Sequence, residues 1–468
     1  MNTNTKNHKL FLLFGVIVTL LISARVILIP FGDLDEIWVY NISRGITEGL
    51  VPYKDMGMVF MPLYNLIFAV PLLICRNLIV YRIMSAALLS AISLILMKAI
   101  SNESSVWYAL PVVLSTVLLM DTANYNYLLF LFALLIFVFN QKTRSYKRNV
   151  LLGVFAALAA LSRQTTGSIL IVAELVYIIV DSEKRGRIKS VLMYLAGVSI
   201  PCFLFLIYLL ATGSFLDFWD HCFFALFIFG SGNRLFDESA LFHILISLVG
   251  ILADIFLIKK SGDKKYISHL LIALTLLTIA LPLIDLNHII MAEMFSFIPI
   301  VRCVKVYAGK YLKPLYSIAV SPLLAIAVVF MAVAGLQGTY FTDRYNELSL
   351  IPVTDITEDY YQIAMKNKAY EEQGRHVVVL SQTSSLISLL EDECNYPFDL
   401  FQTGSLGTED PIFFIEEILQ SPDTIILMPD NYPDENFENP DGVFEYITDN
   451  CSVIDDYGQF RYYQRLAR

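Results

Sequence analysis

The densest group of ionisable side chains follows the first apolar segment of the chain. Asp33, Asp35 and Glu36 place three carboxylates within four residues. Like charges this close repel one another and tend to raise a carboxyl pKa, so one of these acids is suited to act as a general base or to hold a cation. The alternative is a solvated loop in which Asp33 or Asp35 caps a helix, because acids favour helix starts.

Two arginines stand at the edges of apolar segments. Arg163, followed by Gln164, interrupts what would otherwise be one apolar segment of about 30 residues, longer than a single span requires. A guanidinium at the tip of such a helical hairpin is suited to binding a phosphate, or it serves as a snorkelling anchor. Arg82 begins another apolar run, where a charge must be paired or must snorkel.

Two further turns carry polar residues. Asp121 closes one apolar run, and it is also placed to cap a helix starting near Asn124. Asp285 and His288 are three residues apart, so their side chains share a helix face, and Glu293 is a less certain neighbour. His288 is either a structural residue at the interface or a hydrogen-bond partner for a phosphate or a sugar.

These residues belong to a chain of 468 residues that is 56% hydrophobic and only 16% charged. A soluble domain cannot bury that much apolar surface, so the composition predicts a polytopic membrane protein. The six cysteines show no metal-like pair spacing, which excludes a disulfide scaffold and a zinc module. A net charge of -10 without a basic face excludes a nucleic-acid binder.

About eleven apolar segments are predicted as membrane spans, of which 149–162 is marginally short. They cover residues 10–30, 79–97, 105–120, 124–140, 149–162, 166–180, 190–212, 240–258, 266–284, 289–304 and 314–337. The first is kept as an uncleaved anchor rather than a signal peptide. The run Met58–Ile74 is interpreted as re-entrant or interfacial, because the loops richest in Lys and Arg then all face the cytoplasm. We therefore expect a multi-pass cell-membrane protein with a cytoplasmic N-terminus. The isolated acid Glu174 lies inside an apolar segment, and no partner for it is predicted.

The charge balance changes sharply near Gly338. Residues 1–339 hold 26 Lys and Arg against 18 Asp and Glu, whereas residues 340–468 hold 7 against 25. We therefore expect a membrane domain over 1–338 and an acidic extracytoplasmic domain over 339–468. Short apolar segments predict strands at 376–380, 424–428 and 461–464 and helices at 384–390, 411–419 and 442–447, which together favour a small α/β domain. Cys394 and Cys451 either pair there or stay free.

The first polar loop resembles that of the polyprenyl-phosphate-sugar-dependent membrane glycosyltransferases with the GT-C fold. This family includes protein O-mannosyltransferases and the lipid A aminoarabinose transferase. The residues that carry the resemblance are, in order, Asp35-Glu36, Tyr40, Gly49, Pro52-Tyr53, Asp55 and Pro62-Leu63. One position departs from the family pattern, since Met61 stands where a first proline is usual.

The resemblance implies a role for each candidate residue. It implies that Asp35 and Glu36 contain the catalytic base, and that Arg163, Arg82 and His288 serve the donor phosphate. The supporting positions are Asp121, Tyr53, Asp55, Asp285 and Gln164. No cofactor is certain, and a divalent cation stays open.

The leading hypothesis is an inverting transfer of a sugar from a polyprenyl-phosphate donor to a glycan, lipid or protein acceptor at the outer membrane face. Membrane lipids surround the protein, and nucleic acid is not expected as a partner. The competing hypothesis is a transporter, flippase or polysaccharide polymerase without this site, which would favour midplane polar residues and repeat symmetry. A third is a non-catalytic membrane protein that presents the acidic domain to a partner.

Overall fold

The computed structural model describes most of the chain and shows two compact units. The described residues are 3–232, 236–281, 283–307, 313–342, 344, 346–381, 383–391, 395, 397, 399, 401–430 and 442–465. Unit 1 comprises Met1–Ile29, Arg82–Leu206 and Leu235–Gln337. Unit 2 comprises Pro30–Tyr81, Ile207–Arg234 and Gly338–Arg468, so it joins the acidic C-terminal segment to two earlier stretches of the chain.

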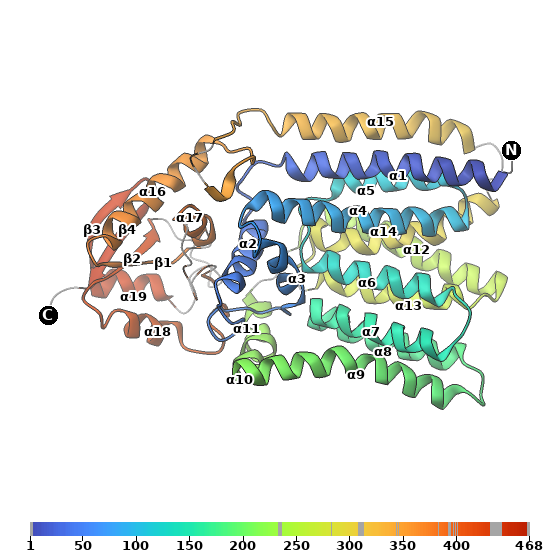
Figure 1. Cartoon of the computed structure of the whole chain (residues 1–468), viewed down its shortest axis with the longest axis horizontal. Helices are drawn as coiled ribbons and strands as arrows, with labels where there is room; N and C mark the ends of the chain where they lie inside the picture. Colours follow the sequence, from blue (N-terminus) through green and yellow to red (C-terminus); the bar gives the residue numbers. More distant parts are fainter. Residues whose placement is uncertain are drawn as a thin grey trace. The chain divides into compact units, whose positions relative to one another are not determined.

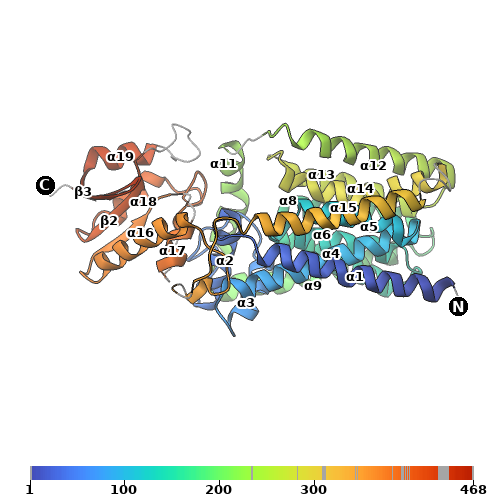
Figure 2. The same cartoon turned by 90° about the horizontal axis from the view of Figure 1, so that it is seen from above.

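Unit 1 is built from long apolar helices. They are α1 (Thr3–Ile27), α5 (Val106–Leu119), α6 (Tyr125–Asn140), α7 (Tyr146–Ser162), α8 (Gln164–Asp181), α12 (Ala240–Ser261), α13 (Lys265–Leu277), α14 (Leu286–Tyr307), α15 (Lys313–Ala334) and most of α4 (Leu78–Glu103) and α9 (Arg187–Thr212). A short 3-10 turn, η2 (Thr278–Ala280), extends α13. Helices α1, α5 and α15 pack side by side (Figures 1 and 2).

Each apolar segment that the sequence predicts as a span overlaps one of these helices, and the predicted segments 10–30, 266–284 and 314–337 extend three or more residues past the helix end. Five of them, α1, α4, α8, α9 and α12, are long and apolar enough to cross a bilayer by length and composition. The chain therefore carries several candidate membrane helices. The total of eleven spans and the cytoplasmic N-terminus stay predictions.

Unit 1 also buries acids inside its helices. Asp254 of α12 accepts a hydrogen bond from Nδ1 of His269 of α13 over 2.6 Å, and both side chains are almost fully buried. Glu174, for which the sequence suggests no partner, accepts from Nδ2 of Asn140 over 2.9 Å. Because a charge within a membrane is expensive, these acids are found hydrogen-bonded.

The segment Met58–Ile74 contains one short helix, α3 (Leu63–Leu72), within unit 2. Ten helical residues extend over about 15 Å, which is half the thickness of the hydrocarbon core. The ordered residues before it, Met58–Met61, are buried and non-helical. These dimensions support the interpretation of this segment as re-entrant or interfacial.

Unit 2 contains the short helices and the only sheet seen in the described residues. Its helices are α2 (Leu34–Thr47), α3, α10 (Phe215–Trp219), the π-helical η1 (Asp220–Phe224), α11 (Ala225–Gly232), the 3-10 turn η4 (Asn346–Leu348), α16 (Asp355–Glu371), α17 (Ser384–Glu391), α18 (Pro411–Ile418) and α19 (Val443–Asn450). Its strands are β1 (His376–Val379), β2 (Thr424–Pro429), β3 (Cys451–Tyr457) and β4 (Phe460–Arg465).

The four strands form a mixed sheet in the order β1-β2-β4-β3. β1 and β2 are parallel, and the other pairs are antiparallel. Alternate residues face opposite layers: Ile426 and Tyr463 join the apolar core with α18 and α19, whereas Tyr462 packs on Tyr370 of α16. Because both faces of the sheet are covered, the sequences of β1 and β2 are nearly continuous apolar runs.

The small α/β arrangement expected near the C-terminus is present in unit 2. Each of the six predicted elements has its counterpart among β1, α17, α18, β2, α19 and β4. Three elements of this segment were not predicted, the 3-10 turn η4, the helix α16 and the edge strand β3. Cys394 lies outside the described residues, and Cys451 is buried.

Candidate active site

The acidic pair lies in the first turn of α2, within unit 2. The side chain of Asp33 caps this helix by accepting a hydrogen bond from the backbone N–H of Asp35 over 3.1 Å. Of the two caps that the sequence allows, the structure therefore shows Asp33. Asp35 is exposed and Glu36 is buried, so the two acids of the pair have different surroundings. A helix N-terminus stabilises negative charge on both.

Buried ion pairs fix the position of α2. Tyr40 donates to Oε2 of Glu347 over 2.6 Å, and Nη1 of Arg44 lies 3.6 Å from the same oxygen. Arg44 has no exposed surface, and Arg76 bridges Glu347 and Glu48 at 2.9 and 2.6 Å. Buried charges are tolerated when they are paired this closely. Two residues that sequence reasoning did not select, Arg44 and Glu347, thus hold the helix that carries the acidic pair.

Tyr53 and Asp55 build the turn that follows α2. Oδ2 of Asp55 accepts from the backbone N–H of Val51 over 2.7 Å. Tyr53 adopts a positive φ of 73°, and its buried hydroxyl donates to the carbonyl oxygen of Phe60 over 3.1 Å. A positive φ is costly for a bulky residue, so the surrounding contacts must impose it. These contacts are structural, and a supporting role in chemistry stays a prediction for both residues.

Arg163 ends α7 and precedes α8 in unit 1. Its Nη1 donates to Oδ1 of Asn126 over 2.6 Å, and its Nη2 donates to the carbonyl oxygen of Ile279 over 2.9 Å. The Nε group makes no hydrogen bond to any residue that the structure describes. The guanidinium is therefore held in one orientation and keeps a donor for a ligand. Gln164, the first residue of α8, is buried beside it.

Asp121 forms an ion pair with Arg25, and it does not cap α6. Nη2 of Arg25 lies 3.0 Å from Oδ1 of Asp121, and Nε of Arg25 donates to the carbonyl oxygen of Met120. Helix α6 begins at Tyr125, so the capping position is Asn124, whose side chain accepts from the backbone of Asn126. The expectation that Asp121 caps this helix is corrected, because it lies three residues too early.

Asp285 and His288 converge as their spacing predicts. Oδ1 of Asp285 accepts from the backbone N–H of His288 over 2.9 Å and pairs with its Nδ1 over 2.8 Å. Burial raises the pKa of Asp285, but the hydrogen bonds from His288 and Asn287 outweigh it, and the pKa lies below its ordinary value. Nδ1 is thereby engaged, and Nε2 of His288 makes no hydrogen bond to any residue that the structure describes. Glu293 does not join them, because it pairs with His243.

Arg82 is fully buried near the start of α4. Its Nη1 donates to the carbonyl oxygen of Ile27, the last residue of α1, and to that of Ile29 just beyond the helix. Snorkelling to lipid headgroups does not describe this side chain, since none of it is exposed. Ile29 stands six residues before Asp35 in the sequence, so Arg82 fixes the end of α1 from which the acidic loop departs.

The turns that carry these residues in unit 1 contact one another. Arg25 joins the end of α1 to the α5–α6 turn, and Arg163 joins the α7–α8 turn to the start of α6 and to η2. Thr278 of η2 donates to Thr166 of α8 over 3.1 Å. Asp121, Arg163 and the segment leading to Asp285 therefore belong to one end of the helical unit.

The described acids, histidines and cysteines provide no group of three that is arranged to hold a metal ion. Asp35 and Glu36 are adjacent in the sequence, but a cation site needs further oxygen ligands.

No protein-family model and no curated protein sequence matches this chain. Solved structures do match it. ArnT from Cupriavidus metallidurans in the apo state is similar over 100% of this chain and 99% of its own, with a TM-score of 0.60 and 11% identity. ArnT from the same organism bound to undecaprenyl phosphate gives a TM-score of 0.57 at 12% identity, covering 98% of each chain.

A third similar structure is the Archaeoglobus fulgidus oligosaccharyltransferase in complex with Zn and sulfate. It has a TM-score of 0.50 and 10% identity, and the match covers 89% of this chain and 68% of that one. These proteins are membrane glycosyltransferases of the GT-C type. The chain thus has the GT-C fold, as the resemblance in its first polar loop predicts.

Proposed function

We propose that this protein transfers a sugar from a polyprenyl-phosphate donor to an acceptor on the extracytoplasmic side of the cell membrane. The observation that carries the proposal is the full-length similarity in fold to ArnT, one structure of which holds undecaprenyl phosphate. The acidic pair in the loop after α1 and the oriented arginine at the α7–α8 turn supply the chemistry that such a transfer needs.

The proposed reaction is a single displacement with inversion. The acceptor oxygen attacks the anomeric carbon of the sugar while the bond from that carbon to the phosphate oxygen breaks. Asp35 or Glu36 takes the proton of the acceptor hydroxyl, and the polyprenyl phosphate leaves with the bonding electron pair. Arg163 and His288 stabilise the charge that grows on the departing phosphate. The mechanism requires these groups to face the same side of the membrane.

Asp35 and Glu36 offer two candidates for the base. Exposed Asp35 is accessible to an incoming acceptor, whereas buried Glu36 is shielded from water. Single substitutions therefore decide which one accepts the proton. In archaeal oligosaccharyltransferase a zinc ion was present in the crystal, and a divalent cation beside the acidic pair stays part of the proposal for this chain.

The competing candidate is a transporter or flippase, or a polysaccharide polymerase that lacks a GT-C site. The buried pair Asp254 and His269 favours a transporter, because intramembrane ionisable pairs often mark an ion path. A transporter or flippase leaves the donor intact, and a polymerase without a GT-C site does not depend on Asp35 and Glu36. Donor consumption that is lost when these two acids are replaced therefore separates the candidates.

The test uses the full-length protein in lipid nanodiscs with a panel of polyprenyl-phosphate sugars and crude envelope glycans. Release of free polyprenyl phosphate is measured for the native protein and for the double variant Asp35→Asn with Glu36→Gln. We expect the native protein to consume at least one donor and the double variant to consume none. Equal release from both proteins ends the assignment.

A further inference from the structure

Unit 2 contains a cavity whose lining includes two of the predicted supporting positions, Tyr53 and Asp55, but neither acid of the pair Asp35 and Glu36. Its volume is about 520 Å³, within the range of about 300–1,000 Å³ typical of small-ligand sites. Three stretches distant in sequence line it: the turn Tyr53–Gly57, the region Leu216–His221, and the loop Leu406–Glu409. The turn Tyr53–Gly57 follows directly on α2, the helix that carries the acidic pair.

The walls of this cavity are held together by close contacts. Asp220 accepts hydrogen bonds from the backbone N–H of Thr408 over 2.9 Å and from its hydroxyl. Gly407 packs so tightly on Asp220 that an added Cβ would lie 2.1 Å from Oδ2, and a Cβ on Gly57 would lie 2.2 Å from the carbonyl oxygen of Ser405. These contacts fix the three stretches relative to one another, so the cavity is a built feature of unit 2.

His221 presents one ring nitrogen to the cavity. Its Nδ1 lies 3.0 Å from the carbonyl oxygen of Asp217, and a carbonyl only accepts, so Nδ1 carries the hydrogen. In the neutral ring Nε2 therefore carries a lone pair, and no described residue donates to it. The side chain is only 13% exposed. His221 lies in the π-helical segment η1. Such segments are rare in proteins, and those that occur are frequently found at functional sites.

The charges that line the cavity select against phosphate. Asp55, Asp217, Asp220 and Glu409 contribute four carboxylates, and Lys54 is the single lysine in the lining. An anionic ligand would be repelled, whereas sugar hydroxyls donate readily to carboxylates and to Nε2 of His221. The aromatic rings of Tyr53 and Phe414 add apolar surface against which the carbon face of a sugar can pack.

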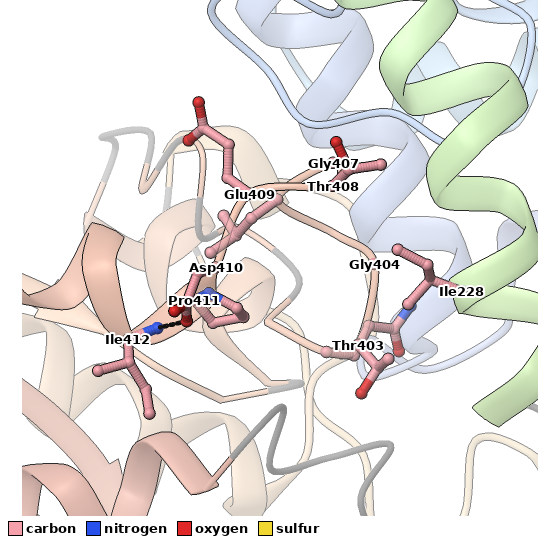
Figure 3. A pocket seen from close by; sticks show the side chains of 11 residues that line it. Ile228, Thr403, Gly404, Gly407, Thr408, Glu409, Asp410, Pro411 and Ile412 are labelled. Atoms are coloured by element: carbon pink, nitrogen blue, oxygen red, sulfur yellow. Dashed lines mark hydrogen bonds between the residues drawn. The ribbon is translucent and has the colours of Figure 1, made fainter.

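A second cavity of about 320 Å³ adjoins the first and shares Leu406, Thr408 and Glu409 with it. Figure 3 shows its wall, in which the loop from Thr403 to Ile412 passes Ile228 of α11. Asp410 at the end of this loop accepts from the backbone of Ile412 and caps α18, so the loop has a fixed end (Figure 3). Two adjoining cavities suit a chain of sugar units better than they suit a single sugar unit.

We propose that these adjoining cavities bind the acceptor as an oligosaccharide without phosphate groups, recognised through its hydroxyls by Asp217 and by Nε2 of His221. The role of this oligosaccharide as the acceptor rests on the proposed transferase function, whereas the binding of a neutral glycan does not. The lipid-phosphate donor is bound elsewhere, since the carboxylates of this cavity exclude it.

The test is glycan binding by the full-length protein in phosphatidylethanolamine nanodiscs. The probes are an array of neutral and of phosphorylated oligosaccharides. We expect at least one neutral oligosaccharide to bind, and its affinity to fall about tenfold or more in His221→Ala and in the isosteric variant Asp217→Asn. The matched control Asp449→Asn, an exposed acid outside the cavity, leaves the affinity unchanged. Thermal melting of each variant identifies a loss of folding.

Three results overturn the inference: no neutral glycan binds, both cavity variants bind as the native protein does, or phosphorylated glycans bind preferentially. The donor-inactive variant Asp35→Asn with Glu36→Gln is included on the same array. Neutral glycan binding that this variant retains and His221→Ala loses supports the cavity even if no donor is ever consumed. The failure of the transferase proposal is thereby distinguished from the failure of this one.

Discussion

Nη1 of Arg163 donates a hydrogen bond to Oδ1 of Asn126 over 2.6 Å, so a residue between α7 and α8 is tied to the first turn of α6. Nη2 of the same side chain is bound to the carbonyl oxygen of Ile279. Two of the three guanidinium nitrogens thus set the orientation of the group. A rigidly held arginine loses little further entropy when it binds a phosphate oxygen.

The first prediction concerns this guanidinium. Arg163→Gln removes the charge that stabilises the departing phosphate, and we expect the rate of lipid-phosphate release to fall by about 30–100-fold, the equivalent of about 2–3 kcal/mol. Arg163→Lys should recover part of the rate, since it restores charge without the fork. Arg144→Lys, at an ion pair with Asp181, is the matched control. A rate for Arg163→Gln equal to that of the control contradicts the assignment.

The second prediction separates the acids of the first polar loop. Asp33→Asn should keep most of the activity, because asparagine caps a helix about as well as aspartate. Asp35→Asn or Glu36→Gln should lower release by at least about 100-fold, depending on which one is the base. Donor consumption by purified single variants measures this. Full activity in both Asp35→Asn and Glu36→Gln would remove the base from this helix.

The third prediction concerns the support of α2. Glu347→Leu removes one acidic partner of buried Arg44, which keeps its ion pair with Glu48 at 3.8 Å, and breaking a buried pair in this way costs about 3–5 kcal/mol. Arg76→Gln should cost about 1 kcal/mol or less, since the Arg76 side chain is 39% exposed. Thermal melting of the purified variants compares them. An equal melting temperature for both variants would show that the Arg44–Glu347 contact contributes little.

The fourth prediction is a pH dependence set by Asp399. Burial raises the pKa of this carboxyl to about 6, although hydrogen bonds from Ser388 and Asn41 and the charge of Arg44 oppose the shift. The folded chain holds this proton more tightly than the unfolded chain. The protonated carboxyl therefore contributes at most about 3 kcal/mol to the free energy of unfolding. This contribution is complete below about pH 4 and is lost as the pH rises through 6.

The variant Asp399→Asn tests this dependence, because its side chain does not titrate. The melting temperature of the native protein relative to that of the variant should fall by several degrees between pH 4 and pH 7. A constant difference over this range would show that Asp399 titrates at its ordinary pKa.

Local patterns in the sequence were sufficient for much of the fold. Apolar runs locate the helices of unit 1, since a membrane-type helix is apolar over most of its length. The helix α16 was not predicted because Asp355–Glu371 is largely polar, and β3 was not predicted because this edge strand, Cys451–Tyr457, is largely exposed. Both elements are recognised only from their packing against β1 and β4.

In the candidate site too, contacts within one helix could be predicted from the sequence, whereas contacts between distant elements could not. The contact between Asp285 and His288 follows from a spacing of three residues on one helix. The partners of Arg163 and Arg44 cannot be predicted from spacing. Asn126 and Glu347 lie on other elements, and only the folded chain brings each of them close to its arginine. Spacing along the sequence does not single out His221, because the π-helical segment η1 that contains it is recognised only in the folded chain.

The claim on which the account depends is that the first polar loop and the α7–α8 turn face the same side of the membrane. Single cysteines at the exposed positions Lys54, Thr165 and Lys142, in a cysteine-free protein that still releases lipid phosphate, test it directly. We expect an impermeant thiol reagent added to intact cells to label positions 54 and 165 but not 142. Labelling of only one of positions 54 and 165 from outside would contradict the account.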